Sequence, residues 1–100
     1  MNINDIASKA QQASGMCGAL AHPTRLNVLW ILCEGENSVG ELARRLALRQ
    51  SAVSQQLARL RRARLVTTRR EGRMIFYSLA GWHVRTMIET VHDIVRDQRA

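Results

Sequence analysis

Several features that mark other protein classes are scarce in this chain of 100 residues. Two cysteines are present, Cys17 and Cys33, and their spacing is not that of a CxxC pair, which indicates neither a disulfide framework nor a zinc finger. Aromatic residues make up only 4% of the chain, too few for the stacking platforms that bind single-stranded nucleic acid. We therefore expect no metal site, and we do not expect single-stranded nucleic acid to be the partner.

Long apolar runs are also missing, and the N-terminus lacks the basic-then-apolar pattern of a signal peptide. We expect a cytoplasmic protein with no membrane partner. No nucleophile with a neighbouring base, no paired carboxylates and no phosphate-binding glycine loop occur, and His22, His83 and His92 show no shared site. The chain is therefore not predicted to be an enzyme, and neither catalytic residues nor a cofactor are expected.

Positive charge is concentrated in one part of the chain. The formal net charge is +7, and arginine supplies all but one of the fifteen basic residues. Residues 44–73 hold ten arginines and a single acidic residue, Glu71. Arginine suits phosphate and base recognition better than lysine does, so this segment predicts a surface that binds a polyanion. The alternative is a solvated basic face without a partner, which usually carries more lysine and interspersed glutamate.

Residues 38–63 are predicted to form two short helices joined by a tight turn. Ser38 followed by Glu41 is a capping pair that indicates the start of a helix. In the second helix Val53, Leu57 and Leu60 recur at spacings of four and three and form one apolar face.

The opposite face of that second helix carries polar side chains that can contact DNA. Amide and guanidinium groups pair with base edges in the major groove, and hydroxyl groups reach phosphates. This arrangement predicts the reading helix of a helix-turn-helix motif, with its outward side chains at Gln50, Ser51, Ser54, Gln55 and Arg59.

A β-hairpin is predicted over residues 65–79. Two stretches rich in Val, Thr, Ile, Phe and Tyr flank Glu71-Gly72, and Gly72 can adopt the positive φ that a tight turn requires. Arg73 lies at the tip and is placed to reach a minor groove or the neighbouring phosphates. Such a hairpin after a reading helix is the wing of a winged helix.

The remaining segments complete a mainly helical domain. Pro23 starts a central helix, and residues 34–37 are predicted to be a turn. Terminal helices are expected at about 4–21 and 81–98, each with an apolar stripe. The N-terminal stripe, which includes Ile6 and Cys17, serves either dimerisation or packing on the domain's own core, and the sequence favours neither.

The order helix, helix, helix-turn-helix, wing, helix resembles the ArsR–SmtB family of bacterial winged-helix regulators, in particular the haemolysin- and nodulation-regulator subgroup. The resemblance covers nearly the whole chain and rests on LAHPTRLNVLWIL at 20–32, on the stretch 38–79 and on the closing helix. It implies one winged helix-turn-helix domain over 1–100, with element order α-α-α-α-β-β-α and dimerisation through the terminal helices.

The resemblance also implies a homodimeric repressor of a near-palindromic operator, released by an effector that the sequence does not identify. It transfers contact with double-stranded DNA to Gln50, Ser51, Ser54, Gln55 and Arg73. Arg49 stands where relatives have a capping serine, so we expect it to exchange a cap worth about 1 kcal/mol for a phosphate contact. Gln56 stands where a histidine is common.

The family's known sensor sites are incomplete in this chain. Cysteines are absent around residues 40–42, and only part of the ligand set expected in the last helix is present, so no metal site is predicted. Thiol-sensing relatives pair one cysteine in the second helix with one in the last. The corresponding positions in this chain are Trp30 and Arg96, so that pair is absent. Cys17 and Cys33 are predicted to be small buried side chains, and a thiol switch formed by these two is the second hypothesis.

A non-specific or architectural nucleic-acid-binding protein is the alternative function. It would share the basic charge, but it has no need for the array of Ser51, Ser54 and Gln55. Competition with random DNA separates the two functions, because only a sequence-specific protein keeps its preferred site.

Overall fold

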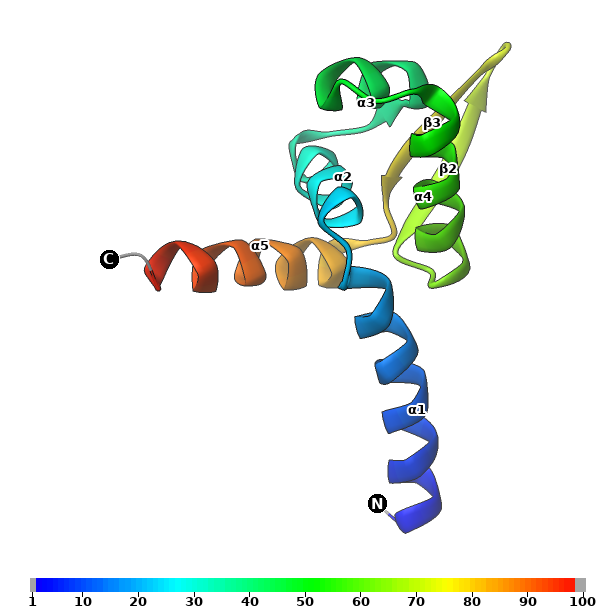
Figure 1. The fold of residues 1–100 in the computed structure, drawn as a ribbon. Helices are drawn as coiled ribbons and strands as arrows, with labels where there is room; N and C mark the ends of the chain where they lie inside the picture. The colour runs from blue at the N-terminus through cyan, green and yellow to red at the C-terminus, as the bar shows by residue number, and fades with distance from the viewer. Residues whose placement is uncertain (1, 99–100) are drawn as a thin grey trace.

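The structure is a computed structural model that describes residues 2–98. In this range a mainly helical fold carries a small antiparallel sheet, as predicted (Figure 1). The elements are α1 (Ile3–Leu20), α2 (Pro23–Glu34), β1 (Asn37–Ser38), α3 (Val39–Leu46), α4 (Gln50–Arg62), β2 (Val66–Glu71), β3 (Met74–Leu79) and α5 (Trp82–Asp97).

Side chains at the helix starts explain where several helices begin. Asn2 caps α1, because its Oδ1 accepts a hydrogen bond from the Asp5 N–H at 2.9 Å. The Ser38 hydroxyl caps α3 by accepting from the Glu41 N–H at 3.2 Å. Helix α2 begins with Pro23 in its first turn, as predicted. The residue before it, His22, caps the helix, because its Nδ1 accepts a hydrogen bond from the Thr24 N–H.

The sheet has the strand order β1-β3-β2. Strands β2 and β3 form the predicted hairpin, in register from Val66 opposite Leu79 to Glu71 opposite Met74, and Gly72 between them has φ +61°. Strand β1 was not predicted. The predicted turn at 34–37 is wrong at both ends, because Glu34 is the last residue of α2 and Asn37 pairs with Tyr77 of β3. A two-residue strand has no periodicity of its own, and only this long-range pairing creates it.

Helix α2 lies at the centre of the molecule. The hydrophobic core takes Val28, Leu29 and Leu32 from it, all nearly or fully inaccessible to solvent. Helices α3 and α4, the connection from α4 to β2, and the inner ends of β2 and β3 close around these residues with side chains that include Leu42, Val53, Leu57, Leu60, Leu65, Val66 and Leu79.

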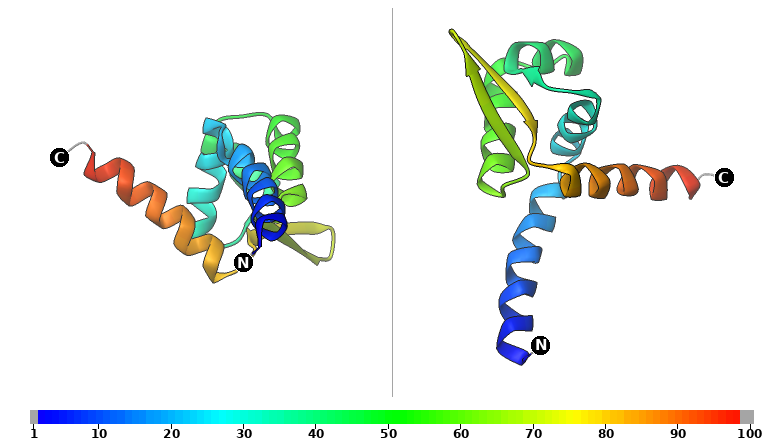
Figure 2. Two further views of the ribbon diagram at one scale, coloured as in Figure 1. Left: turned by 90° about the horizontal axis from the view of Figure 1, so that it is seen from below. Right: turned by 180° about the vertical axis from the view of Figure 1, so that it is seen from behind.

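The two terminal helices contribute little to this core. Ala19 is the one buried residue of α1, and Ile88 is the one buried residue of α5. Figures 1 and 2 show both helices projecting from the body in different directions, with their free ends far from the sheet. No helix within residues 2–98 is both long and apolar enough to cross a lipid bilayer.

Candidate nucleic-acid interface

Helix α4 separates its apolar and polar side chains as the sequence predicted. Val53, Leu57 and Leu60 are completely buried against the rest of the domain. On the exposed surface lie four of the candidate DNA-contacting residues, namely Gln50, Ser51, Ser54 and Gln55. The polar face of α4 is thus free to approach a groove of DNA.

A residue in the left-handed backbone conformation ends α3 and sets the angle between α3 and α4. Ala47 has φ +54°, and its N–H closes the end of α3 on the carbonyl oxygens of Ala43 and Arg44. Arg49 then stands at the N-cap of α4, exposed and without a side-chain capping bond. Its guanidinium is therefore available near the positive end of the helix dipole, where phosphates bind favourably.

The start of α4 and the wing tip line one groove. Gln50 and Arg73 both border this cavity of about 350 Å³, together with Ser38, Val39, Gly40, Met74 and Ile75. Two candidates that are 23 positions apart in the sequence are therefore brought together. Met74 and Ile75 are half exposed and were not among the predicted site residues. These two apolar residues are adjacent in a hydrophobic strand, and nothing in that pattern indicated a role at this surface.

The arginines of residues 44–73 fall into two groups. Arg44, Arg45 and Arg69 are paired with glutamates, and these contacts lower the pKa of Glu41, Glu34 and Glu36. Within residues 2–98, no carboxylate lies within ion-pair distance of the other seven, which are Arg49, Arg59, Arg61, Arg62, Arg64, Arg70 and Arg73. Their charge remains available to a polyanion.

Arg69 lies in the outer half of the wing, opposite Phe76, and links it to Glu36. Its guanidinium donates to Glu36 at 2.8 Å and to Glu71 at 2.8 Å, and it lies 4.6 Å from the ring centroid of Phe76. These contacts raise the pKa of Arg69. Because both carboxylates already hold this arginine, it is less suited to phosphates than Arg73.

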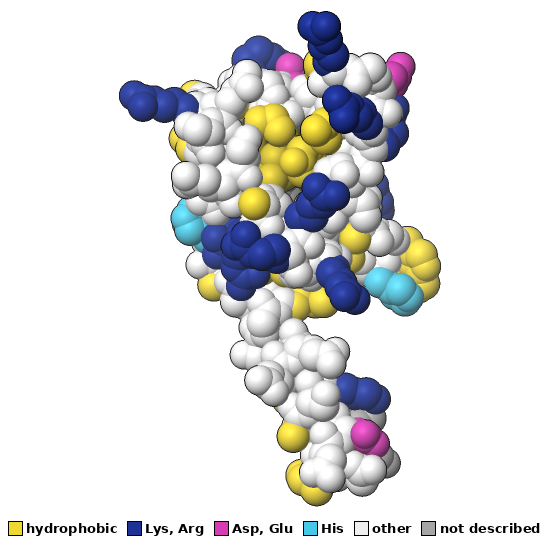
Figure 3. Space-filling view, turned by 90° about the vertical axis from the view of Figure 1, so that its right-hand side faces the viewer, with side chains coloured by type: hydrophobic (Ala, Val, Ile, Leu, Met, Phe, Trp, Pro, Cys, Tyr) yellow, Lys and Arg dark blue, Asp and Glu magenta, His cyan; other side chains and the backbone are white. Residues whose placement is uncertain are grey.

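Figure 3 shows the molecule from the right-hand side of Figure 1. Lysine and arginine side chains are spread over this face and surround an apolar patch. Acidic side chains appear only at its upper edge and near the N-terminal tip of α1. The electrostatic footprint expected for a polyanion is therefore present on this surface.

Arg59 is the candidate whose surroundings differ most from those predicted. It is half-buried, and its Nη2 lies 3.5 Å from the Gly15 carbonyl oxygen of α1. The neighbouring Gln56 is also half-buried, and its Oε1 accepts a hydrogen bond from Arg25 of α2. Sequence reasoning gave Gln56 and Arg25 no role, because no local pattern links residues 31 positions apart.

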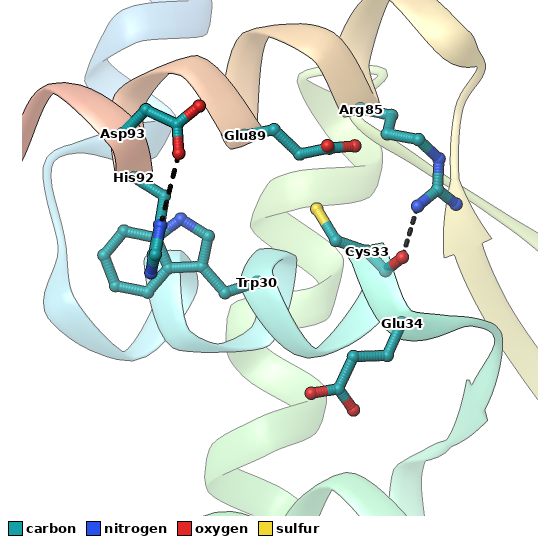
Figure 4. A pocket seen from close by; sticks show the side chains of 7 residues that line it. All are labelled: Trp30, Cys33, Glu34, Arg85, Glu89, His92 and Asp93. Carbon is teal, nitrogen blue, oxygen red and sulfur yellow. Dashed lines mark hydrogen bonds and ion pairs between the residues drawn. The ribbon is translucent and has the colours of Figure 1, made fainter. Parts of the chain in front are cut away.

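A second cavity, of about 470 Å³, lies between α2 and α5 (Figure 4). Its lining mixes a thiol, an aromatic ring and charged groups from Trp30, Cys33, Glu34, Arg85, Glu89, His92 and Asp93. The Arg85 guanidinium donates to the Cys33 carbonyl oxygen, and the His92 ring meets Trp30 edge-on at 5.6 Å.

The two cysteines of the thiol hypothesis are free and lie in different surroundings. Cys17 is exposed on α1, which differs from the predicted buried position, since α1 packs on the domain only at its last turn. Cys33 is half-buried, and burial, followed by the charge of Glu89, raises the pKa of its thiol. A raised pKa reduces the reactive thiolate at neutral pH. Within residues 2–98, no three His, Cys, Asp or Glu side chains are grouped as metal ligands.

Comparison with known proteins places this geometry in a family. Residues 22–68 match the model of the arsR family of bacterial regulatory proteins. The chain is 45% identical to the transcriptional activator HlyU of Vibrio cholerae over 92% of this chain and 85% of that protein. It is 44% identical to the biofilm growth-associated repressor of Agrobacterium fabrum, over 86% of this chain and 74% of that protein.

A solved structure agrees with the arrangement of the elements. The homodimeric winged helix-turn-helix DNA-binding domain of a possible ArsR-family regulator from Mycobacterium bovis, studied by NMR in solution, superposes with a TM-score of 0.90. The sequence identity is 28%, and the alignment covers 97% of this chain and 90% of that one. The resemblance stated from the sequence is therefore confirmed.

Proposed function

The chain belongs to the ArsR family of bacterial regulatory proteins, and on that premise we propose that it is a homodimeric repressor of a near-palindromic operator. The family assignment makes it a transcriptional regulator with a winged helix-turn-helix DNA-binding domain. The related proteins named above are regulators and not enzymes. The assembly, the direction of control and the residues that read DNA go beyond the family assignment.

One observation carries the proposal: the exposed face of α4 and the wing tip Arg73 border the same side of the molecule, with Gln50 and Arg73 on one groove. Gln55 supplies an amide that can pair with an adenine edge, and Ser51 and Ser54 supply hydroxyls for phosphates or bases. Arg49, at the start of α4, and Arg73, at the wing tip, supply guanidinium groups for the phosphate backbone.

Dimerisation is assigned to the terminal helices, at about 4–21 and 81–98. Apolar side chains on both helices stay exposed in the single chain, among them Ile3 at 74%, Ile6 at 46% and Ile94 at 52%. Pairing of two chains across a two-fold axis buries these side chains and presents two α4 helices together. The homodimeric state of the M. bovis domain supports this assembly.

In this assembly residues 38–63 read the operator, residues 65–79 form the wing, and the whole of 1–100 is one domain. A bound dimer occupies its operator and excludes polymerase from it, which makes repression the simplest mode of control. The relatives include an activator and a repressor by name, so the direction of control is tested together with the operator.

The test is a pull-down of fragmented genomic DNA with the purified full chain, followed by sequencing. It is repeated with Zn(II), arsenite, peroxide and polysulfide. An inverted repeat with half-sites one helical turn apart is the expected product. Loss of enrichment with one additive identifies the effector class. Sequence-independent recovery that disappears at moderate salt contradicts the proposal and favours an architectural protein.

A further inference from the structure

Arg25 connects three helices at one point. From α2, its Nε donates to the Ala19 carbonyl oxygen of α1 at 2.6 Å, and its Nη1 donates to Oε1 of Gln56 in α4 at 2.9 Å. Its Nη2 also lies 3.5 Å from the Gly18 carbonyl oxygen. The last turn of α1 contains no basic residue, so Arg25 supplies the cation that the carbonyl end of that helix favours.

Capping of α1 does not require Gln56. A guanidinium has five N–H donors in a rigid plane, so it can hold α1 with one edge and α4 with another. Arg59 adds a second link, since it reaches from α4 to the Gly15 carbonyl oxygen.

The two adjacent glutamines of α4 lie in different surroundings. Gln55 is exposed toward the candidate DNA surface, whereas Gln56 is half-buried and bonded to Arg25.

Few other contacts fix the direction of α1. Ala19 is the only buried residue among its 18 residues, and the helix projects from the body (Figures 1 and 2). A helix of this length spans about 27 Å, so a 10° change at the junction moves its far end by about 5 Å. That displacement exceeds the rise of one base pair, about 3.4 Å.

We propose that Arg25 and Gln56, assisted by Arg59, are positioning residues that fix the angle between the dimerisation helix α1 and the reading helix α4. This inference rests on the proposed homodimer. In such a dimer, that angle determines how far apart the two α4 helices lie. The junction therefore selects the spacing between half-sites, while Gln55 and its exposed neighbours select their sequence.

The test selects bound duplexes from a random DNA library with the full chain and with three variants, Gln56→Ala, Gln56→Glu and Gln55→Ala. Affinities are then measured for the enriched repeat and for repeats lengthened or shortened by one base pair. We expect the unmodified chain to prefer its best spacing by about tenfold, or 1.4 kcal/mol. Gln56→Ala should reduce that preference at least about threefold and leave the half-site sequence unchanged.

The other two variants separate positioning from reading. Gln56→Glu keeps an acceptor for Arg25 and should retain the preferred spacing, even where its charge lowers affinity for every duplex. Gln55→Ala should change the half-site sequence at one position and keep the spacing. A merely stabilising contact would lower the melting temperature of Gln56→Ala without changing its spacing preference, and that result overturns the inference.

Two further outcomes are decisive. If circular dichroism shows that Gln56→Ala does not fold, Arg25→Lys replaces it, because a lysine keeps the charge but lacks the planar fork that joins Ala19 to Gln56. Its spacing preference should fall in the same way, and an unchanged preference overturns the inference. If the unmodified chain enriches no inverted repeat, the proposed dimeric function fails and the junction has no spacing to select.

Discussion

The central body and the terminal helices of this molecule are stabilised in different ways. Helix α2 places Val28 and Leu29 in a core from which solvent is excluded. In contrast, α1 buries Ala19 alone and leaves Ile3 and Ile6 exposed, although its sequence carries an apolar stripe of its own. The hydrophobic core is fully formed within a single chain. The terminal helices, in contrast, expose apolar surface that only another molecule can cover.

The largest effect is expected in the centre. Leu29→Ala removes a completely buried side chain and should lower the free energy of unfolding by about 2–5 kcal/mol. Urea denaturation at fixed protein concentration measures the change. A loss below about 1 kcal/mol would show that α2 is not the centre of the core, and the contrast with α1 would disappear.

The next effect concerns assembly. Ile6→Asp places a charge on the exposed apolar stripe of α1, and in a symmetric dimer the charge occurs twice. We expect the dissociation constant of the dimer to rise on the order of a hundredfold, about 2.8 kcal/mol. Sedimentation velocity over a range of concentrations measures it.

Ser8→Asp is the matched control for that experiment. It adds the same charge two residues away, at about 200° around the helix, on an exposed polar position. This variant should dimerise like the unmodified chain. Equal dissociation constants for Ile6→Asp and Ser8→Asp would remove the N-terminal helix from the dimer interface.

A smaller effect is expected within the reading surface. Gln55→Ala should cost about 1–3 kcal/mol at one operator position and relax the base preference there, because the amide that pairs with the base edge is lost. Competition among duplexes with single base changes measures it. Unchanged selectivity would mean that α4 does not enter the groove with this face.

The smallest effect is expected at the wing. Arg73→Ala should weaken binding to all sequences alike by about 1 kcal/mol and reduce the slope of log K against log salt by about 1. Arg96→Ala on α5 removes the same charge away from the wing and should leave the slope unchanged. If both variants have the slope of the unmodified chain, the wing does not contact the phosphate backbone.

Much of the fold could be predicted because its signals are local. The Ser38 cap, the apolar spacing of Val53, Leu57 and Leu60, and the turn glycine Gly72 each act within a few residues, and the structure agrees with all three. The fold that these signals predict was confirmed, and the helix boundaries lie within a few residues of those expected.

What could not be predicted depends on pairs far apart in the chain. Strand β1 exists only because Asn37 pairs with Tyr77, and the wing is anchored by Arg69 on Glu36. No periodic pattern encodes such contacts. The sequence likewise gave two uses for the stripe of α1, and its exposure in the single chain now favours dimerisation over packing on its own core.

The candidate site shows the same division. The exposure of Gln50, Ser51, Ser54 and Gln55 follows from helical periodicity alone, so sequence could place them on one surface. Arg59 shares the polar composition of that group, yet its side chain lies against α1, and its role in DNA binding stays a prediction. Periodicity assigns a residue to a helix face, but it does not say which neighbouring helix that face meets.

The most direct test of the proposed dimeric repressor is hydroxyl-radical footprinting on the duplex recovered from genomic DNA, with the stoichiometry measured by sedimentation on the same complex. Two chains should bind one duplex and protect two segments on one face, with centres one helical turn apart, about 34 Å. A single protected segment, or one chain per duplex, would contradict the homodimer that links the terminal helices to the reading surface.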